Sequence, residues 1–465
     1  YDSTGNELGK AKRVMEQGGE SSKRLGFVSQ DGINELPDAL LLKILSSLPT
    51  KTVIATSVLS KRWRSLWKLV PRLEFVSYGN RNIYKFAENV SKSLLSHEAP
   101  ILESLHLKVG DQIDNVYIGV WATIAFSRHV REFVLDLSFH HHGQSVRLPS
   151  SLFCFDTLET LKLMNYVILD VPSPVSMKSL RTLHLRYVVY EGDESVRNLF
   201  SSCPNLEHLV VHRGDCNDSV MRFTIDAPSL KKLSLYDSDS AEKNRGYVIK
   251  APCLRYLEIE NSKGYEYFLI DNASELVEAS IRNVSDIVNE EILGSVKSVK
   301  RLSLDLSPLK IACPTEVMYY QLVYLEMCTN KLEWWNLLTL MLDSSPKLRV
   351  LKLIDHCTST RQHNVEFDKQ YTDQGKWNQP KYVPECLLSL LETLVWRNCN
   401  WGREEEKEVA TYILSNATQL KKATFSTDPI ESKRLCKLAR RRRMRNELDG
   451  VVRASGSCHL VFEFE

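Results

Sequence analysis

The sequence predicts an α/β protein in which a short helical domain precedes a curved parallel sheet built from stacked repeats. Three observations support this prediction. An apolar helical stretch occupies residues 36–67, a hexad of apolar residues recurs over the rest of the chain, and the closing region continues the hexad beyond a polar insertion. The chain has 465 residues, which is more than one globular core usually holds. Several domains or an open solenoid are therefore expected.

The recurring hexad has apolar residues at positions one, four and six, as in Leu158-Glu-Thr-Leu161-Lys-Leu163. Thirteen hexads begin at Leu102, Val130, Leu158, Leu180, Leu206, Leu230, Leu254, Leu276, Val299, Leu322, Leu348, Leu391 and Leu420, the last with alanine at position four. They begin 22–29 residues apart, with one interval of 43, which fits the period of about 20–29 residues in leucine-rich repeats. Positions four and six of a strand share one face, so stacked neighbours must complete their burial. The hexads predict a leucine-rich-repeat solenoid; a leucine-rich globular core with accidental spacing is the alternative.

The composition limits the classes of function. Hydrophobic residues make up 43% of the chain, charged residues 25%, and the net charge is +2. This balance argues against bulk binding to nucleic acid or to a membrane surface. The eleven cysteines are odd in number and never form a C-x-x-C pair. This pattern is typical of reduced thiols and predicts a cytoplasmic or nuclear protein.

Catalytic and metal-binding motifs are missing from the sequence. It holds no phosphate-binding loop, no H-E-x-x-H, no G-x-S-x-G and no paired cysteine ligands for zinc. His140–His142 could bind a metal, but three consecutive side chains cannot all face one ion, so an exposed turn is the simpler interpretation. We therefore expect a protein that is not an enzyme and that uses no metal or cofactor.

Residues 31–70 predict three short helices, after a polar segment, 1–30, that is expected to be disordered. Pro37 suits the first turn of a helix that Pro49 ends. The apolar residues between these prolines spread over roughly 200° of the helical wheel, about twice the usual stripe. Further helices are expected over 52–59 and 61–67, the last capped by Ser60. So small a domain needs a second partner to bury this surface, either another protein or the start of the solenoid.

The run L-P-D-x-L-L-x-x-I-L-S-x-L-P that begins at Leu36, with L-S-K-R-W-R-x-L-W ending at Trp67, resembles the F-box of plant proteins. The resemblance implies docking on a Skp-type adaptor and, through it, on the cullin and the RING protein of an SCF-type ubiquitin ligase. By position it implies that ten residues form or support the adaptor-binding surface: Leu36, Pro37, Ile44, Leu45, Leu48, Pro49, Val53, Leu59, Trp63 and Trp67.

Residues 71–99 are expected to link this domain to the repeats through a strand at Leu73–Val76 and a helix over 83–95. The repeats then occupy 100–365. Asparagine, the usual polar residue after the hexad, stands at position eight of some repeats and is missing from others, so we expect an incomplete hydrogen-bond ladder. These asparagines are Asn165, Asn261, Asn283 and Asn398.

Residues 366–465 are expected to form a C-terminal region with the last repeats, and a polar insertion near 355–381, expected to be a loop, overlaps its start. The segment from Val383 onward and the closing strand near Leu460 resemble the FBD module of plant F-box/leucine-rich-repeat proteins. The resemblance implies two terminal repeats that cap the solenoid. Arg440–Arg443 could be a nuclear-import signal or an anion-binding patch, but a solvated face of a C-terminal helix is the favoured interpretation. Glu404–Glu406 suit the acidic first turn of a helix.

Substrate contacts are expected from hexad positions three, five and seven, because these side chains project from the strands onto the concave sheet face. The candidates are His184, Arg186, His208, His212, Tyr236, Tyr256, Glu258, Glu260, Arg282 and Tyr324. They predict a face that changes from basic and histidine-rich to acidic with tyrosines, which suits a bipolar protein partner. A solvated sheet face with unrelated charges is the alternative.

These observations favour the substrate-recognition subunit of an SCF-type ubiquitin ligase, in which the helical domain binds the adaptor and the concave face binds the protein to be ubiquitinated. Two alternatives remain at this point. One is a repeat scaffold that takes no part in a ligase, and the other is an F-box receptor that needs a small molecule.

Overall fold

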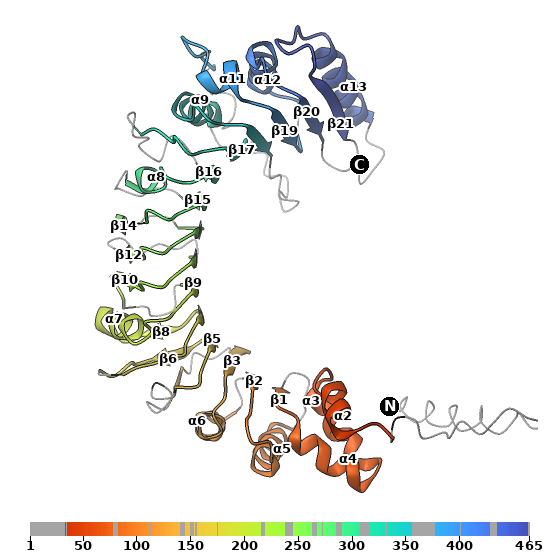
Figure 1. Cartoon of the computed structure of the whole chain (residues 1–465), viewed down its shortest axis with the longest axis vertical. Helices are drawn as coiled ribbons and strands as arrows, with labels where there is room; N and C mark the ends of the chain where they lie inside the picture. Colours follow the sequence, from red (N-terminus) through yellow and green to blue (C-terminus); the bar gives the residue numbers. More distant parts are fainter. Residues whose placement is uncertain are drawn as a thin grey trace, which may run out of the picture.

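The computed structural model describes residues 33, 35–77, 82–110, 113–139, 145–148, 153, 156–173, 175–214, 219–237, 245–262, 267–271, 273–284, 291–306, 317–330, 333–355, 377–399, 401–427 and 435–463. The described chain forms a long arc with the helical domain at one end and the C-terminal repeats at the other (Figure 1). Three expectations lie outside these ranges: the disorder of residues 1–30, the turn at His140–His142 and most of the insertion near 355–381.

The N-terminal helical domain has the three predicted helices, with shifted boundaries. They are α2 Asp38–Leu45, α3 Thr50–Ala55 and α4 Lys61–Leu66, with single 3₁₀ turns η1 Thr56–Val58 and η2 Trp67–Leu69. The first helix ends at Leu45 and not at Pro49, because Pro49 instead precedes the first turn of α3. Ser60 caps α4 as predicted, since its hydroxyl accepts a hydrogen bond from the Trp63 amide at 3.4 Å.

Fifteen strands of the described chain form one parallel sheet along the inner wall of the arc (Figure 1). In order along the sheet they are β1 Arg72–Val76, β2 Ser104–Gly110, β3 Glu132–Phe139, β5 Thr160–Met164, β7 Thr182–Arg186, β9 His208–His212, β11 Lys232–Tyr236, β13 Tyr256–Glu260, β15 Glu278–Val284, β16 Arg301–Leu306, β17 Tyr324–Cys328, β18 Val350–Ile354, β19 Thr393–Arg397, β20 Lys422–Ser426 and β21 His459–Glu463. The solenoid predicted from the hexads is therefore confirmed.

Each of the thirteen hexads gives a strand that begins two residues after its first position. Positions four and six are buried in these strands, as Leu161 and Leu163 of β5 illustrate. One further strand extends the sheet at each end. At β1 the hexad pattern begins once more at Val70, with Leu73 and Phe75 in the buried positions. At the other end β21 pairs with β20, so the strand expected near Leu460 closes the sheet after the strands of the two terminal repeats.

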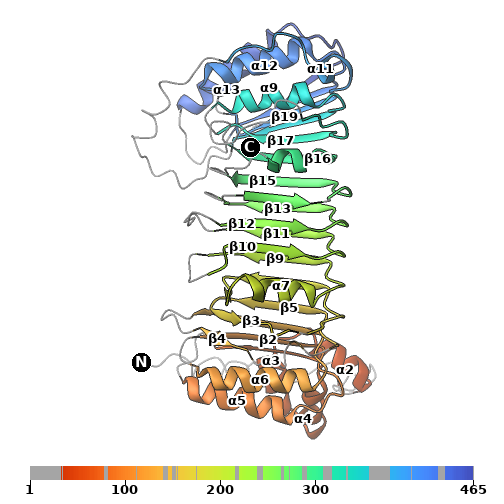
Figure 2. The ribbon, with the colours of Figure 1, turned by 90° about the vertical axis from the view of Figure 1, so that its left-hand side faces the viewer.

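The convex side carries helices in some repeats and short strands in others (Figure 2). The helices are α5 Ile83–Ser96, α6 Asn115–Ser127, α7 Asp193–Ser201, α8 Glu291–Ser295, α9 Trp334–Ser344, α11 Glu385–Ser389, α12 Glu404–Asn416 and α13 Leu435–Asp449. Two small parallel sheets consist of β4 Val146–Arg147, β6 Val167–Leu169 and β8 Val189–Tyr190, and of β10 Arg222–Asp226, β12 Gly246–Lys250 and β14 Tyr267–Asp271.

A helix and a short strand can cover similar lengths of the convex side. Repeat length alone does not decide between them, since the 28-residue repeat that begins at Val130 carries β4 and the 23-residue repeat that begins at Leu276 carries α8. Helix α6 has 13 residues and β10 has 5, yet both span roughly 17–20 Å, because a helix rises about 1.5 Å per residue and a strand about 3.3 Å. A repeat of 28 residues, such as the one that begins at Leu102, has room for a helix. Those of 24 residues that begin at Leu206 and Leu230 close with a strand.

The asparagines at hexad position eight adopt a left-handed backbone conformation, with φ between 50° and 63°. Asparagine tolerates this conformation better than most residues, which explains the residue choice. The amide of Asn283 donates to the Asn261 side chain at 2.7 Å, and Asn165 donates to Asp136 at 2.9 Å. Tyr187 has the same conformation at position eight without an asparagine. The ladder is therefore incomplete, as predicted.

None of the helices within the described ranges is both long enough and apolar enough to cross a membrane.

Candidate protein-binding surfaces

Helix α2 of the N-terminal domain has two apolar stripes, and only one of them is covered. Leu41 and Leu45 are fully buried in the domain core. Leu40, Ile44 and, just beyond the helix, Leu48 recur at the i, i+4, i+8 spacing and keep 49%, 41% and 40% of their surface exposed. A lone exposed leucine needs no explanation, but a complete second stripe does.

Two residues from the turn before α4 extend this uncovered surface. Val58 is 84% exposed and Leu59 is 65% exposed. We call Leu40, Ile44, Leu48, Val58 and Leu59 the apolar face of the domain. Two of its members, Leu40 and Val58, were not among the adaptor-binding candidates. Leu40 has a sequence signal, since it lies four residues before Ile44 on the helix. Val58 has none, because its exposure depends on how η1 turns.

The ten sequence-predicted adaptor-binding residues divide into two layers. Ile44, Leu48, Leu59 and the two prolines, Pro37 and Pro49, are exposed, and Leu36 is partly buried. Leu45, Val53, Trp63 and Trp67 are buried in the core of the domain together with Leu41, Leu66 and Val70. The buried members therefore support the surface from beneath and make no part of it themselves.

Hydrogen bonds fix the domain internally and join it to the first repeats. The Arg62 guanidinium donates to the Asp38 carboxylate at 2.6 Å and to the Leu36 carbonyl at 2.5 Å, which holds the start of α2 against α4. The Glu74 amide of β1 donates to the Thr50 hydroxyl of α3 at 2.7 Å. Strand β1 is in turn paired with β2. The apolar face consequently has a defined orientation relative to the sheet.

The concave face contains the sequence-predicted substrate-binding residues. Nine of them lie on the consecutive strands β7, β9, β11, β13 and β15, and Tyr324 lies two strands further along, on β17. On β7, β9 and β13, positions three, five and seven are half-buried or exposed while positions four and six are buried. On β11 and β15 the serines at position five, Ser234 and Ser280, are buried as well. Arg186 and His208 are exposed.

Aromatic rings and a carboxylate join neighbouring strands at the centre of this face. The His184 and His212 rings are 5.5 Å apart, and His212 stacks on Tyr236 with ring centroids 4.3 Å apart. The Tyr236 hydroxyl then donates to a Glu258 carboxylate oxygen at 2.7 Å. Tyr256 lies beside this row under the Lys232 ammonium, which is 4.7 Å from its ring centroid.

The carboxylate of Glu258 is engaged in hydrogen bonds within the protein. Its side chain is only 13% exposed. It accepts hydrogen bonds from Tyr236, from Ser234 at 3.1 Å and from Arg282 at 3.2 Å. Glu258 therefore organises the face, whereas the side chain of Glu260, its neighbour on β13, forms no hydrogen bond or ion pair within the described residues.

A similar arrangement recurs three strands further along the sheet, and it was not predicted. Glu326 of β17 accepts hydrogen bonds from the Tyr324 hydroxyl at 2.9 Å, from Ser303 at 3.3 Å and from Lys352 at 2.8 Å. Arg301 lies 4.0 Å above the Tyr324 ring. In both clusters a carboxylate at hexad position five is shared by a tyrosine, a serine on the preceding strand and a cation on a later strand. The sequence signal that could have revealed the second cluster is the glutamate at hexad position five preceded by a serine at position five of the previous repeat.

The histidines make the face less basic than the sequence suggested. Burial, with repulsion from His184 and Arg186, lowers the pKa of His212 to about 4. Burial and the nearby Lys162 and Arg186 charges likewise lower the pKa of His184. Both imidazoles are therefore neutral at physiological pH. Burial and the bond to Glu258 raise the pKa of Tyr236 to about 12, so its hydroxyl remains a donor.

The arginine run lies on α13, beside the end of the sheet. Met444 and Leu448 anchor this helix in the core, and Arg440 and Arg442 are exposed. Arg443 pairs with Glu447 at 2.6 Å. Neither an import signal nor an anion patch is tested by this geometry, so both stay predictions.

A three-helix domain with an uncovered apolar face, followed by a long parallel sheet of leucine-containing repeats, defines an F-box protein with leucine-rich repeats. Family models match three parts of the chain: the F-box domain over residues 33–75, the LRR repeats of FBD-associated F-box protein At5g56370 over 118–277, and FBD over 379–425.

Full-length relatives agree with these matches. Two F-box/FBD/LRR-repeat proteins of Arabidopsis thaliana are 75% and 58% identical to this chain, over 98% and 97% of both chains respectively. A third is 55% identical over 97% of this chain and 98% of its own length. The chain belongs to the F-box/FBD/LRR-repeat family of plant proteins. Among solved structures, it is distantly similar to a chain in the crystal structure of a Rad7 and Elc1 complex in yeast, with 18% identity, a TM-score of 0.33, and 70% and 85% of the two chains covered.

Proposed function

We propose that this protein is the substrate-recognition subunit of an SCF-type ubiquitin ligase. The observation that carries the proposal is the apolar face of the F-box domain, whose five aliphatic side chains are between 40% and 84% exposed although the domain is fully folded beneath them. A Skp-type adaptor would bury this face and connect the chain to a cullin and a RING protein.

The contribution of this chain to ubiquitin transfer would be positional. A substrate held on the concave face stays at a fixed distance from the adaptor, because the hydrogen bond from the Glu74 amide of β1 to the Thr50 hydroxyl of α3 helps to join the F-box to the sheet. Such tethering raises the effective concentration of a substrate lysine near the conjugating enzyme. This role requires no catalytic residue in the chain itself.

Adaptor binding is tested by co-expression with a plant Skp adaptor and size-exclusion chromatography. We expect the wild type to co-elute with the adaptor and Leu48→Asp to elute alone, because a buried carboxylate without a partner is costly. Leu388→Asp on α11 is the matched control, since Leu388 is also an exposed leucine, at 51%. A wild-type chain that elutes alone and folded would favour the repeat scaffold and contradict the ligase.

Substrate capture is proposed for the concave face around β7 to β15, and Glu260 is a better position to test it than Glu258. Glu258→Lys would leave Tyr236 without its acceptor and place a cation beside Arg282. We therefore compare Arg186→Glu and Glu260→Lys with wild type by proximity labelling in plant cells. Labelled proteins that depend on both residues, with adaptor co-elution intact, would be substrate candidates. An unchanged labelled set in both variants would reject this face.

We also propose that the protein acts in the cytosol or the nucleus. Cys203 and Cys386, which burial gives a raised pKa of about 12, are unpaired thiols in the core. Reduced core thiols suit a reducing compartment. Imaging of a fluorescent fusion tests this proposal, and a signal confined to the secretory pathway would contradict it.

A further inference from the structure

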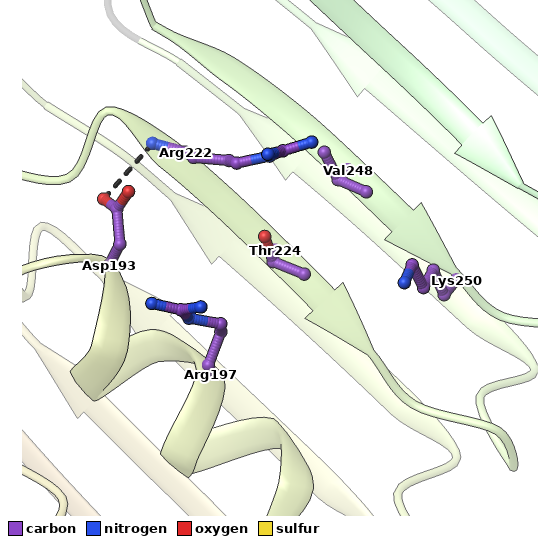
Figure 3. Close-up of a pocket in the computed structure, with 6 residues that line it drawn as sticks. All are labelled: Asp193, Arg197, Arg222, Thr224, Val248 and Lys250. Carbon is purple, nitrogen blue, oxygen red and sulfur yellow. Dashed lines mark hydrogen bonds between the residues drawn. The ribbon is translucent and has the colours of Figure 1, made fainter.

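A pocket on the convex side of the solenoid lies between α7 and the small sheet that contains β10 and β12 (Figure 3). It has a volume of about 450 Å³ and is lined by Asp193, Arg197, Arg222, Thr224, Val248 and Lys250. This volume is typical of a site for a small molecule. The pocket lies on the opposite side of the sheet from the concave face, so the proposed substrate face does not account for it.

Three cations from three different elements line this pocket. Arg197 is on α7, Arg222 on β10 and Lys250 on β12, and Figure 3 shows them around one opening. Within the described residues, no ion pair or hydrogen bond involves the side chain of Arg197 or Lys250. Cations at the rim of the concave sheet behave differently: Arg181 and Lys231, for example, both bind Glu207, at 2.6 Å and 2.8 Å.

The position of the Arg222 guanidinium depends on a glycine. Gly246 is the register partner of Arg222 on β12, and Tyr267 is the next partner on β14. A side chain at Gly246 would meet the Tyr267 ring at 2.5 Å. Because Gly246 has none, the Tyr267 ring covers β12 there and the Arg222 guanidinium lies 5.8 Å from the ring centroid. This contact keeps the guanidinium extended beside the pocket.

The acidic groups near the pocket leave its cations available. One oxygen of the Asp193 carboxylate accepts hydrogen bonds from the backbone amides of Met221 at 3.0 Å and Arg222 at 3.2 Å. Asp226 and Asp271 flank Lys250 in the strand register, but neither forms an ion pair with it. The lining of the pocket therefore holds three cationic side chains and one carboxylate that the backbone already engages, while Asp226 and Asp271 lie beside Lys250 outside the lining.

We infer that this pocket binds a small anion that carries at least two phosphate groups. Arginine guanidinium groups match phosphate oxygens in a bidentate manner, and lysine adds a point charge. The Thr224 hydroxyl, between Arg222 and Lys250 on the pocket floor, supplies a further donor. Three cations spread over about 450 Å³ suit an anion larger than one phosphate. The inference is independent of adaptor binding and of substrate capture.

The test is isothermal titration calorimetry of the full chain with pyrophosphate, repeated with a phosphoserine peptide. We expect pyrophosphate to bind the wild type. The double variant Arg197→Gln, Lys250→Gln should lose at least about tenfold in affinity, because each charge-assisted bond contributes about that factor. Arg442→Gln is the matched control: it removes an exposed arginine from α13 and should leave the affinity unchanged.

A second variant separates lost binding from lost folding. Thr224→Glu places a carboxylate among the cations at a half-buried position, so it should abolish binding while thermal unfolding stays close to that of wild type. No binding of pyrophosphate by the wild type would overturn the inference, as would equal affinity in the double variant, which would locate the anion elsewhere. Binding of the phosphoserine peptide alone would replace the small anion by a phosphorylated protein.

Discussion

The F-box domain keeps part of its leucine residues exposed, whereas the repeats bury the leucines of their hexads. In the repeats, Leu161, Leu257 and their equivalents at hexad position four are completely buried between the sheet and the convex layer. In the F-box domain, Leu40 and Leu48 stay between 40% and 49% exposed. A repeat is completed by the next repeat of the same chain, whereas the F-box domain ends where its partner would begin. Leucine content therefore indicates how much apolar surface must be covered, and the fold decides whether the chain covers it.

The largest expected effect is the contrast between one leucine of the solenoid core and one aliphatic residue of the apolar face. Leu257→Ala should lower the free energy of unfolding by about 2–5 kcal/mol, because it leaves a cavity. Ile44→Ala should lower it by less than about 1 kcal/mol, since Ile44 is 41% exposed. Denaturant unfolding of both variants measures the difference. Equal losses would mean that Ile44 belongs to a core and would remove the distinction between the two regions.

A buried acid near the C-terminal end is a second difference between the two regions, because the core of the F-box domain consists of apolar residues. Glu406 of α12 is fully buried, and burial raises its pKa from the ordinary 4.5 to about 7, in spite of the nearby Arg403. The folded chain therefore holds this proton more tightly than the unfolded chain. Its contribution to stability is complete below about pH 4.5 and is lost as the pH rises through about 7.

Glu406→Gln should consequently be more stable than wild type at pH 8, by about 1–3 kcal/mol, and nearly equal to it at pH 4. Denaturant unfolding at the two pH values tests this expectation. Glu404→Gln is the matched control, because Glu404 occupies the same helical turn and is exposed. If Glu406→Gln kept the pH dependence of wild type, the proton would have to reside elsewhere.

A smaller loss of stability is expected when a hydrogen bond of the concave face is removed. Tyr236→Phe removes the donor to Glu258, and we expect a loss of about 1 kcal/mol in stability, since the pair is half-buried. Tyr320→Phe should have no effect, because Tyr320 is 59% exposed and its hydroxyl makes no hydrogen bond within the described chain. Thermal unfolding compares the two. An unchanged Tyr236→Phe protein would show that this carboxylate cluster is not held by the tyrosine.

The smallest expected effect concerns the charge of His212, which should leave stability unchanged at neutral pH. The imidazole of His212 should stay neutral until the pH approaches about 4, its pKa in the folded chain. The ordinary pKa of histidine is 6.5, so the contribution of the neutral imidazole to stability is lost as the pH falls from about 6.5 to about 4. An NMR titration, with the resonance assigned through His212→Gln, measures this pKa directly. A midpoint near 6.5 would restore the basic character that the sequence suggested for this part of the face.

Much of the fold could be predicted because its pattern is local. Every hexad gives a strand at the same offset, since alternation of side chains along a strand depends only on neighbouring residues. The F-box helices were placed for the same reason, although α2 ends at Leu45 and α3 begins earlier than expected. The strand at Leu73–Val76 was expected as a linker. Its place as the first strand of the sheet was not predicted, because the first predicted hexad begins at Leu102.

The candidate sites were predicted less completely because they combine residues from separate repeats. Hexad positions placed Tyr236 and Glu258 on one face, but not the bonds that make Glu258 structural. The Glu326 cluster was missed for the same reason. The convex pocket likewise could not be predicted from a sequence pattern, because Arg197 and Lys250 are 53 residues apart and lie on a helix and a strand respectively.

The sequence by itself determined that this chain is a repeat solenoid with an F-box domain at one end and an FBD region at the other, because short-range apolar spacing encodes both strands and helices. Only the tertiary structure decided which apolar side chains remain uncovered, which histidines lose their charge and which cations remain unpaired. Those properties depend on burial and on distances between residues that are remote in the sequence. They arise when the repeats stack, and no single repeat contains them.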